Sequence, residues 1–489
     1  MMVIGVDPDQ GGQGGRGGAV ILFTKVPRPG LVKTRLIPPQ GPPFPSDIAS
    51  LYVALLQDTL SAVRELQTVK HSSLVVSFTP SDGEMELSQI VEEFVESPRF
   101  MPQVGSTVTE KVPGAFEVAF RDGYSSVVLI PGDHADLSGS LIGEALEKLA
   151  RPGPAVVLGP TCDGGAFLLG FNRASFERVA FDLEDTHLVC ADIFRRTKAK
   201  GIPCSFLDNR SDIDDWEDAR HFLLQKDFRN TRTWKALHDL GVPQKVPESR
   251  KKVSVIVPTL NEESAIDGLL GSIRRQSSDD FELILVDGGS RDGTVDKAWG
   301  KADSIVFVGK PSRRGQEIVA AADARGDTLL FLHADTVVPP TLLASMLGSL
   351  SDPAVQGGSC RVIFRGRGPK VSFLNALRLC GGKLLNIHGI SSCFYIRRTA
   401  YEQAGGFRED VMEEAVDLRR RAPRSARFVV LNELCTTSAR RFERRRRFLS
   451  TLVVWVTTVL LTRAGLHFTK VESLFWKSVR EPQPLQTRI

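Results

Sequence analysis

The sequence predicts an α/β protein made of two tandem domains, each built on a mostly parallel sheet. Short, apolar, strand-like runs alternate with helical patterns along the chain, and the alternation occurs twice. Such alternation is typical of doubly wound parallel sheets. The chain has 489 residues, too many for one hydrophobic core, which agrees with more than one domain. The two halves therefore look like two copies of one architecture that carry different motifs.

The first series begins with the apolar run Ala19–Lys25, which predicts a strand. After a loop rich in proline and glycine, we expect a helix over 47–65, a strand at Leu74–Phe78, a helix over 85–96, and strands at Val127–Ile130 and Ala155–Leu158. Residues 1–18 carry acids and glycines where a signal peptide has a basic patch and an apolar run, so we interpret them as a flexible leader. The first domain is predicted over 19–225.

The predicted domain junction is Lys226–Lys252, because this segment is polar and charged and contains Pro243 and Pro247. We place a linker at 226–251, the second domain at 252–480 and a tail at 481–489. The second series begins with the strand Val253–Val257 and repeats the scheme of the first.

Composition restricts the class of protein. The 42% hydrophobic and 25% charged fractions are ordinary for a soluble globular protein, and a net charge of +4 by itself indicates no nucleic-acid partner. The seven cysteines are scattered and form no Cys-x-x-Cys pair. This pattern argues against a disulfide framework or a zinc site and favours a reducing, cytoplasmic location.

The longest apolar run is Phe448–Leu461, and it follows the basic segment Arg440–Arg447. Its 14 residues are interrupted by serine and threonine and fall short of the ~20 that span a bilayer. A buried or amphipathic helix is the favoured interpretation, and a peripheral membrane contact through an interfacial helix is the alternative. The basic segment could bind a diphosphate or an anionic surface, or could form a solvated helix face.

Basic side chains gather in the loop after the first strand, where Lys25, Arg28, Lys33 and Arg35 lie close together in sequence. Free backbone amides and several fixed cations in one Pro/Gly loop suit a triphosphate or a sugar phosphate. A solvated basic loop is the alternative.

Two acidic turns strengthen the phosphate interpretation. Asp133 and Asp136 follow a predicted strand, as in nucleotide sites that hold a metal ion, and Asp163 precedes two glycines that allow a ligand to approach the backbone. Magnesium binds through one or two carboxylates together with substrate phosphates. Asp133 is therefore the first candidate ligand for Mg²⁺ or Mn²⁺, and Asp136 is the next.

The loop Lys33–Leu36, the turn at Gly132-Asp133 and the turn Asp163–Gly165 together resemble the "transferase 1" family associated with radical-SAM and selenodomain proteins. The resemblance covers roughly 19–222 and implies a GT-A-like fold similar to the guanylyltransferases of molybdenum-cofactor and deazaflavin-cofactor pathways. In the later stretch DIDDWEDARHF, Asp212 or Asp214 could be a second metal ligand, and a helix N-cap cluster is the alternative. Where the family has Gly-x-Asp-x-Pro, this chain lacks the proline.

In the second half, three strand-like runs each end in a polar or acidic turn, namely VSVIVPTLNEES, LILVDGGSRDGT and LLFLHADT. Open α/β sheets bind ligands at the carboxyl ends of their buried parallel strands. Three such ends converging in one crevice suit a nucleoside diphosphate and a divalent cation.

These runs resemble the donor half of family-2 glycosyltransferases with the GT-A fold, in a branch called "transferase 2", over roughly 252–476. The resemblance implies nucleotide contacts from Thr259, Asn261, Glu262 and Asp287, diphosphate contacts from Arg313 and Arg314, and a bridging Mg²⁺ or Mn²⁺ on Asp335. His333 replaces the first acid of the family's Asp-x-Asp motif, and we expect it to pack beneath the strand, with ligation of the cation as the alternative.

Inverting glycosyl transfer needs a carboxylate that takes the proton of the acceptor. The family carries this base in a Met-Glu-Asp turn, and the matching turn here is Met412-Glu413-Glu414. Glu414 holds the position of the base, and Glu413 is the second candidate. Polar substrate positions of the family are Ile318 and Ile390 here, which fits altered substrate choice or decayed catalysis.

The pairing of the two halves implies consecutive steps. The first half would activate a sugar or small-molecule phosphate with a nucleoside triphosphate, and the second would transfer a glycosyl group from a nucleotide-sugar to a small-molecule or sugar acceptor. The alternatives are two glycosyltransferase domains, or one glycosyltransferase domain beside a degenerate binding or scaffolding domain.

Overall fold

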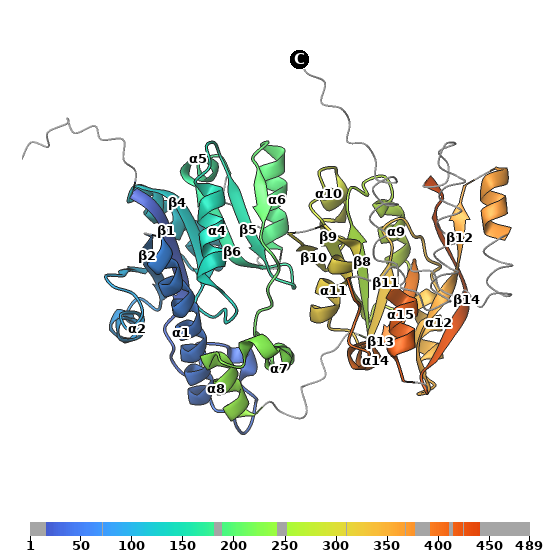
Figure 1. Ribbon diagram of the computed structural model, residues 1–489, viewed down its shortest axis with the longest axis horizontal. Coiled ribbons are helices and arrows are strands. Elements are labelled where there is room, and N and C mark those ends of the chain that lie inside the picture. Colours follow the sequence, from blue (N-terminus) through green and yellow to red (C-terminus); the bar gives the residue numbers. More distant parts are fainter. Residues whose placement is uncertain are drawn as a thin grey trace, which may run out of the picture. The chain divides into compact units, whose positions relative to one another are not determined.

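The computed structural model describes residues 16–70, 72–179, 188–241, 252–309, 311–366, 368–376, 392–409, 414–423 and 425–440. The chain divides into two compact units, Met1–Pro247 and Glu248–Ile489, which are described separately (Figure 1). Each unit contains one seven-stranded sheet.

The sheet of the first unit has the order β3-β2-β1-β4-β6-β5-β7. Its strands are β1 (Arg16–Lys25), β2 (Ser73–Thr79), β3 (Arg99–Pro102), β4 (Tyr124–Pro131), β5 (Val156–Pro160), β6 (Ala166–Asn172) and β7 (Cys204–Phe206). β6 runs antiparallel to both of its neighbours, while the other pairs are parallel. β1 and β4 are neighbours, so the loops that follow them lie at the same edge of the sheet.

Helices cover both faces of this sheet (Figure 1). The helices are α1 (Pro45–Val69), α2 (Glu84–Val91), α3 (Val108–Arg121), α4 (Gly139–Leu149), α5 (Arg173–Phe176), α6 (Val189–Ala199), α7 (Trp216–Leu224) and α8 (Arg232–Leu240), with short 3₁₀ turns at Thr34–Leu36 and Lys226–Phe228. Side chains of α1, α2 and α4 pack with β1, β2 and β4 in one large apolar core. A second cluster joins α1 to α7 and α8.

The sheet of the second unit has the order β10-β9-β8-β11-β13-β12-β14, which repeats the order and strand directions of the first. Its strands are β8 (Val253–Thr259), β9 (Phe281–Asp287), β10 (Ser304–Phe307), β11 (Thr328–Leu332), β12 (Val355–Arg365), β13 (Cys393–Arg397) and β14 (Arg427–Ser438). Its helices are α9 (Ile266–Ile273), α10 (Thr294–Ala298), α11 (Arg313–Asp323), α12 (Leu342–Ser349), α14 (Arg398–Gln403) and α15 (Glu414–Arg421). The predicted fold class, two tandem α/β domains with mostly parallel sheets, is confirmed.

Some boundaries differ from those expected. β1 begins at Arg16, inside the predicted leader, because Arg16 and Gly18 already pair with Tyr124 and Ser126 of β4. The segment predicted as linker contains α8, which packs on α1 through Leu237 and other apolar side chains. This helix therefore belongs to the first unit.

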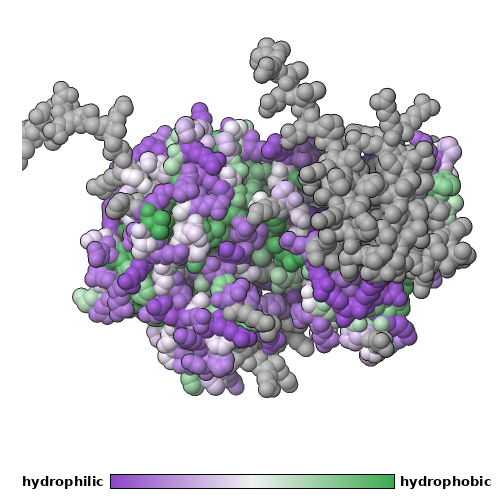
Figure 2. All heavy atoms as spheres, viewed as in Figure 1, coloured by the Kyte–Doolittle hydropathy of each residue, from purple (hydrophilic) through white to green (hydrophobic). Residues whose placement is uncertain are grey.

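The apolar run Phe448–Leu461, for which a buried or amphipathic helix was favoured over a peripheral membrane contact, lies outside the described residues. In the part of the chain that is described, no helix has the length and apolar character needed to cross a membrane. Figure 2 shows a largely hydrophilic face with small, separate hydrophobic areas.

Candidate functional site

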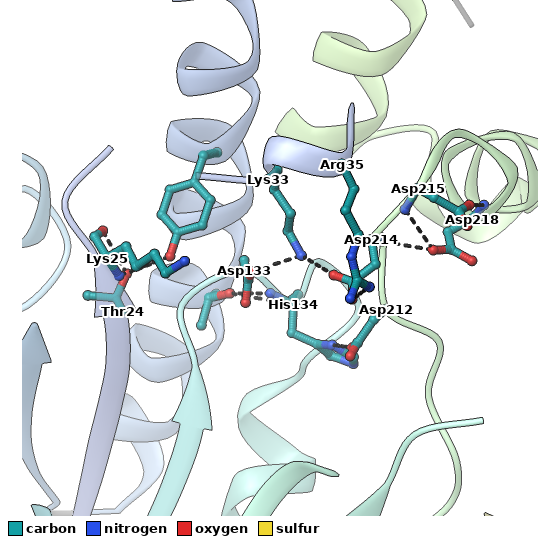
Figure 3. A network of polar contacts seen from close by, with 12 residues as sticks. Thr24, Lys25, Lys33, Arg35, Asp133, His134, Asp212, Asp214, Asp215 and Asp218 are labelled. Atoms are coloured by element: carbon teal, nitrogen blue, oxygen red, sulfur yellow. Dashed lines mark hydrogen bonds and ion pairs between the residues drawn. The ribbon is translucent and has the colours of Figure 1, made fainter. Parts of the chain in front are cut away.

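In the first unit, Lys33 lies at the centre of the predicted phosphate site. Its backbone adopts a left-handed conformation, with φ 41°, at the start of the turn Thr34–Leu36. The buried ammonium lies 2.8 Å from Asp133 Oδ2 and 2.9 Å from Asp214 Oδ1 (Figure 3). Arg35 Nη1 lies 3.3 Å from the other oxygen of Asp214. The basic loop therefore meets the turn of Asp133 and the stretch of Asp214.

The electrostatics of this cluster favour a charged Lys33. Burial lowers the pKa of the Lys33 ammonium, but the carboxylates of Asp133, Asp214 and Asp212 outweigh it and raise the pKa above its ordinary value. The ammonium thus neutralises two carboxylates that are candidate metal ligands.

His134, which no sequence motif singled out, links the turn of Asp133 and Asp136 to the stretch of Asp212. Its ring is buried and stacks on Phe167, with ring centres 5.2 Å apart. Nε2 lies 2.9 Å from Asp136 and Nδ1 lies 2.6 Å from Asp212, which are ion-pair distances without good hydrogen-bond angles. Burial lowers the pKa of His134, but the two aspartates raise it to about 10. The imidazolium therefore holds both carboxylates.

The acids of the stretch DIDDWEDARHF fall into two groups with different contacts. Asp215 is the N-cap of α7 and accepts hydrogen bonds from the amides of Glu217 and Asp218, while Asp218 accepts from the amides of Asp214 and Asp215. These two acids form a helix cap. Asp212 and Asp214 point away from the cap toward His134 and Lys33 (Figure 3).

Other predicted residues lie at varying distances from the cluster. Asp136 joins it through His134 and lies 3.4 Å from Arg210 Nε. Asp163 accepts hydrogen bonds from Thr161 and Gly165 within its own turn, and it is near enough to raise the pKa of Asp212.

Two of the cations do not reach the cluster. The Lys25 ammonium lies 3.5 Å from the carbonyl oxygen of Leu31, and the Arg28 guanidinium pairs with Asp82 and Glu86. Lys33 and Arg35 therefore contact the acidic cluster, whereas Arg28 pairs with the acids around α2, and the joint action of these cations on a phosphate stays a prediction. Asp133, Asp212 and Asp214 offer carboxylate oxygens, which are the type of ligand that Mg²⁺ and Mn²⁺ prefer.

In the second unit, the ends of β8 and β9 are joined by hydrogen bonds. Asp287 is fully buried, and its carboxylate accepts from the Gly289 and Ser290 amides, the Ser290 hydroxyl and the Thr259 hydroxyl. Burial raises the pKa of Asp287, and these donors oppose that rise. The side chains of Asp287 and Thr259 therefore hold the turn after β9 in place, and their contact with a nucleotide stays a prediction.

Asn261 extends this connection between the two turns. It has φ 55°, its amide donates to Ser290 Oγ at 2.8 Å, and its Oδ1 accepts from the Arg291 amide at 2.8 Å. The Glu262 carboxylate pairs with Arg440. The turn after β8 is therefore held in place by the turn after β9 and by the chain beyond β14.

Asp335 follows β11 and lies near Arg440, the residue that pairs with Glu262. Its Oδ1 accepts from the Thr437 hydroxyl at 2.9 Å, and its Oδ2 lies 3.9 Å from Arg440 Nη2. Arg440 thus lies between Asp335 and Glu262. Two carboxylates gathered at the carboxyl ends of β8 and β11 fit the expected position of a divalent cation.

Arg313 and Arg314, at the start of α11, meet Glu414, at the start of α15. Arg313 Nη2 donates to both oxygens of the buried Glu414, at 3.1 and 3.3 Å, and Arg314 Nη2 donates at 3.4 Å. Arg313 also contacts His333 Nε2. His333, expected to pack beneath its strand, is half-buried and engages the arginine instead.

Glu317 was not selected from the sequence. It is buried one turn along α11 from Arg313, with Oε1 3.9 Å from the guanidinium. Burial raises its pKa, Arg313 opposes the rise and Glu414 adds to it, giving a pKa of about 8. Its neighbour Gln316 donates to the carbonyls of Thr259 and Val286 at 2.8 and 2.6 Å, which fixes α11 against the strand ends.

Several candidate positions cannot be placed. Glu413, Met412, Ile390 and Arg441–Arg447 lie outside the described residues. Ile318 packs against the apolar core of the unit. The Ile318 side chain therefore contributes to packing.

Two family models match parts of this chain. Residues 254–405 match the model of "Glycosyl transferase family 2", and residues 59–182 match that of "Uncharacterized protein conserved in bacteria (DUF2064)". A PGL/p-HBAD biosynthesis glycosyltransferase of Mycobacterium tuberculosis strain H37Rv is 56% identical over 88 residues, which are 17% of this chain and 34% of the relative.

An undecaprenyl-phosphate 4-deoxy-4-formamido-L-arabinose transferase of Aeromonas hydrophila is 32% identical over 117 residues, which are 22% of this chain and 35% of the relative. The chain spans about a third of the length of the curated relatives it matches. A solved mannosyltransferase of Pyrobaculum calidifontis, in complex with GDP-Man and Mn²⁺, is 25% identical, with a TM-score of 0.33 over 51% of this chain and 83% of that one. Residues 254–405 are therefore similar to glycosyl transferase family 2, and residues 59–182 are similar to the DUF2064 family.

Proposed function

We propose that the second unit transfers a glycosyl group from a nucleotide-sugar to an acceptor. The observation that carries the proposal is the line of contacts from His333 through Arg313 to Glu414. It joins the turn that holds Asp335 to a pair of arginines and then to a carboxylate. A cation site, a diphosphate site and a base are the three parts that an inverting transfer requires.

The arrangement suggests an order of events. Mg²⁺ or Mn²⁺ on Asp335 would neutralise the charge that develops on the leaving nucleoside diphosphate. Arg313 and Arg314 hold Glu414 in the structure, and the donor's diphosphate would compete for them because it carries more charge than one carboxylate. Glu414 would then be released to accept the proton of the acceptor hydroxyl. Glu413 stays the second candidate for the base.

We further propose that the first unit binds a nucleoside triphosphate or a sugar phosphate. Lys33 and Arg35 would leave Asp133 and Asp214 and bind the phosphates. The carboxylates released in this way would then hold Mg²⁺ or Mn²⁺. This unit would supply the activated group, which makes the chain bifunctional. The contact network between Lys33, Asp133 and Asp214 supports this role. The association with radical-SAM proteins and the cytoplasmic location also stay predictions.

Two variants of the full chain test the division of labour. Asp133→Asn should weaken Mg²⁺- or Mn²⁺-dependent binding of nucleoside triphosphates and leave nucleotide-sugar binding unchanged. Asp335→Ala should weaken nucleotide-sugar binding and leave triphosphate binding unchanged. Calorimetric titration with a panel of both ligand types measures this. Asp82→Asn is the control, because Asp82 is an exposed acid of the first unit that pairs with Arg28.

The outcomes separate the alternatives. If both variants weaken only nucleotide-sugar binding, both units are glycosyltransferase-like. If Asp133→Asn changes nothing and Asp335→Ala abolishes donor binding, the first unit is a binding or scaffolding domain. Unchanged binding in Asp335→Ala contradicts the assignment of the second unit.

A further inference from the structure

Three cysteines far apart in the sequence meet in the second unit. Cys360 lies on β12, Cys393 on β13 and Cys435 on β14, and their sulfur atoms all lie within 4.8 Å of one another. Each side chain is at most 3% exposed. The scattered positions of these cysteines in the sequence had argued against a metal site, but the pairing of the three strands brings their sulfur atoms together.

The strand register explains the meeting. β12 and β13 are antiparallel, and the register that pairs Ser359 with Phe394 places Cys360 directly opposite Cys393 at the next step. β14 pairs with β12 on the other side, where an irregularity after Cys360 brings Cys435 opposite Val362, two residues farther along the same face. All three thiols therefore lie on one face of three adjacent strands.

We propose that Cys360, Cys393 and Cys435 bind a soft, thiophilic metal ion through three sulfur atoms. An ion ~2.3 Å from each of three sulfurs, as in zinc–thiolate bonds, needs those sulfurs about 4 Å apart. The Sγ atoms of Cys360 and Cys393 are 3.2 Å apart, and no pair in the cluster is farther apart than 4.8 Å. The thiols thus reach ligand geometry with shifts of less than about an ångström.

The donor set narrows the class of ion. Among the described residues the cluster contains three cysteines and no histidine or carboxylate, a ligand set that does not suit Mg²⁺ or Mn²⁺, which prefer oxygen. Zn²⁺ usually takes four ligands, and burial leaves little room for a water to supply the fourth. Monovalent copper, which thiolate ligands select, is therefore the first probe, and Zn²⁺ is the second.

The location gives the ion a structural role. The ion would cross-link three strands, one of which carries Thr437, the partner of Asp335, two residues after Cys435. The Ser392 carbonyl, next to Cys393, accepts from the His333 amide at 3.4 Å. A bound ion would therefore brace the strands around the turn of Asp335.

The test uses the full chain, purified without oxygen and stripped with a chelator. After loading with Cu⁺ or Zn²⁺ and gel filtration, the wild type should retain one ion per chain, and X-ray absorption should report only sulfur neighbours. Cys360→Ala, Cys393→Ala and Cys435→Ala should each lose the ion. Cys190→Ala, which removes an equally buried thiol of the first unit, should keep it.

Circular dichroism of the stripped variants shows whether they fold, and the X-ray absorption of the wild type decides the question if they do not. Retention of Cu⁺ alone identifies a three-coordinate site, and retention of Zn²⁺ with sulfur neighbours identifies a divalent one. The proposal is overturned if the wild type retains no ion, if oxygen or nitrogen neighbours dominate, or if the folded alanine variants keep the ion.

Discussion

Replacement of Glu414 by glutamine tests the proposed base most directly. The change keeps the size of the side chain but removes the charge that faces Arg313 and Arg314. The Glu414 side chain is 3% exposed, and those of the two arginines are 35% and 10% exposed. Removing one partner of a buried ion pair costs about 3–5 kcal/mol, and the partly exposed Arg313 moves this toward the lower value.

Loss of stability must be separated from loss of chemistry, and the same helix offers a matched control. Asp417 is also a buried acid of α15, and it pairs with Arg421 of the same helix at 2.8 Å. Asp417→Asn should destabilise the second unit by a similar amount. If the role of Glu414 is only structural, both variants should transfer at similar rates.

The assay is transfer from a nucleotide-sugar to water or an added acceptor, together with donor titration, below the temperature at which either variant unfolds. Glu414→Gln should bind the donor at least as well as the wild type, because the arginines are free of a competing carboxylate. Its transfer rate should fall by ~10²–10⁴-fold, as expected for loss of a general base. Glu414→Asp, which restores the family's residue, should keep most of the rate. A folded Glu414→Gln variant that transfers as fast as Asp417→Asn refutes the assignment.

Two further predictions concern the first unit. The two aspartates raise the pKa of His134 in the folded state to about 10, above its ordinary 6.5, so the stability that its charge contributes is complete below pH 6.5 and is lost as pH rises toward 10. Hydrogen exchange of the β4 amides should therefore show His134→Gln to be less stable than the wild type at neutral pH and close to it near pH 10. A difference in stability that grows with pH would contradict this prediction. A Cβ on Gly132 would lie 2.4 Å from Thr24 Oγ1, so Gly132→Ala should lower the free energy of unfolding by ~1–3 kcal/mol through overpacking. Gly143→Ala is the control and should be tolerated, because the nearest atom to its Cβ is 3.4 Å away. Equal unfolding midpoints for the two variants would show that the turn at Gly132 adjusts freely.

Local sequence patterns predicted much of the fold and some residues of each candidate site. The apolar runs at Ala19–Lys25 and Val253–Val257 predicted the central strands because burial on both faces of a sheet selects continuous apolar residues. The acids after β4 and β11 were recognised because parallel strands present their carboxyl ends at one edge. The positions of Lys33, Asp133 and Asp335 follow from this rule, and the predicted identities of the elements are confirmed more firmly than their ends.

The pairing partners were decided only by the tertiary structure. Lys33 meets Asp214 across 181 positions, and Arg313 meets Glu414 across 101. Such contacts depend on which strands become neighbours and on the register between them, and no periodicity within one segment records either. The cluster of Cys360, Cys393 and Cys435 shows the same limit, since three thiols with no metal-binding spacing become neighbours once β13 pairs with β12 and β12 pairs with β14. The sequence by itself thus determined which residues stand at the strand ends, and the sheet determined which of them touch.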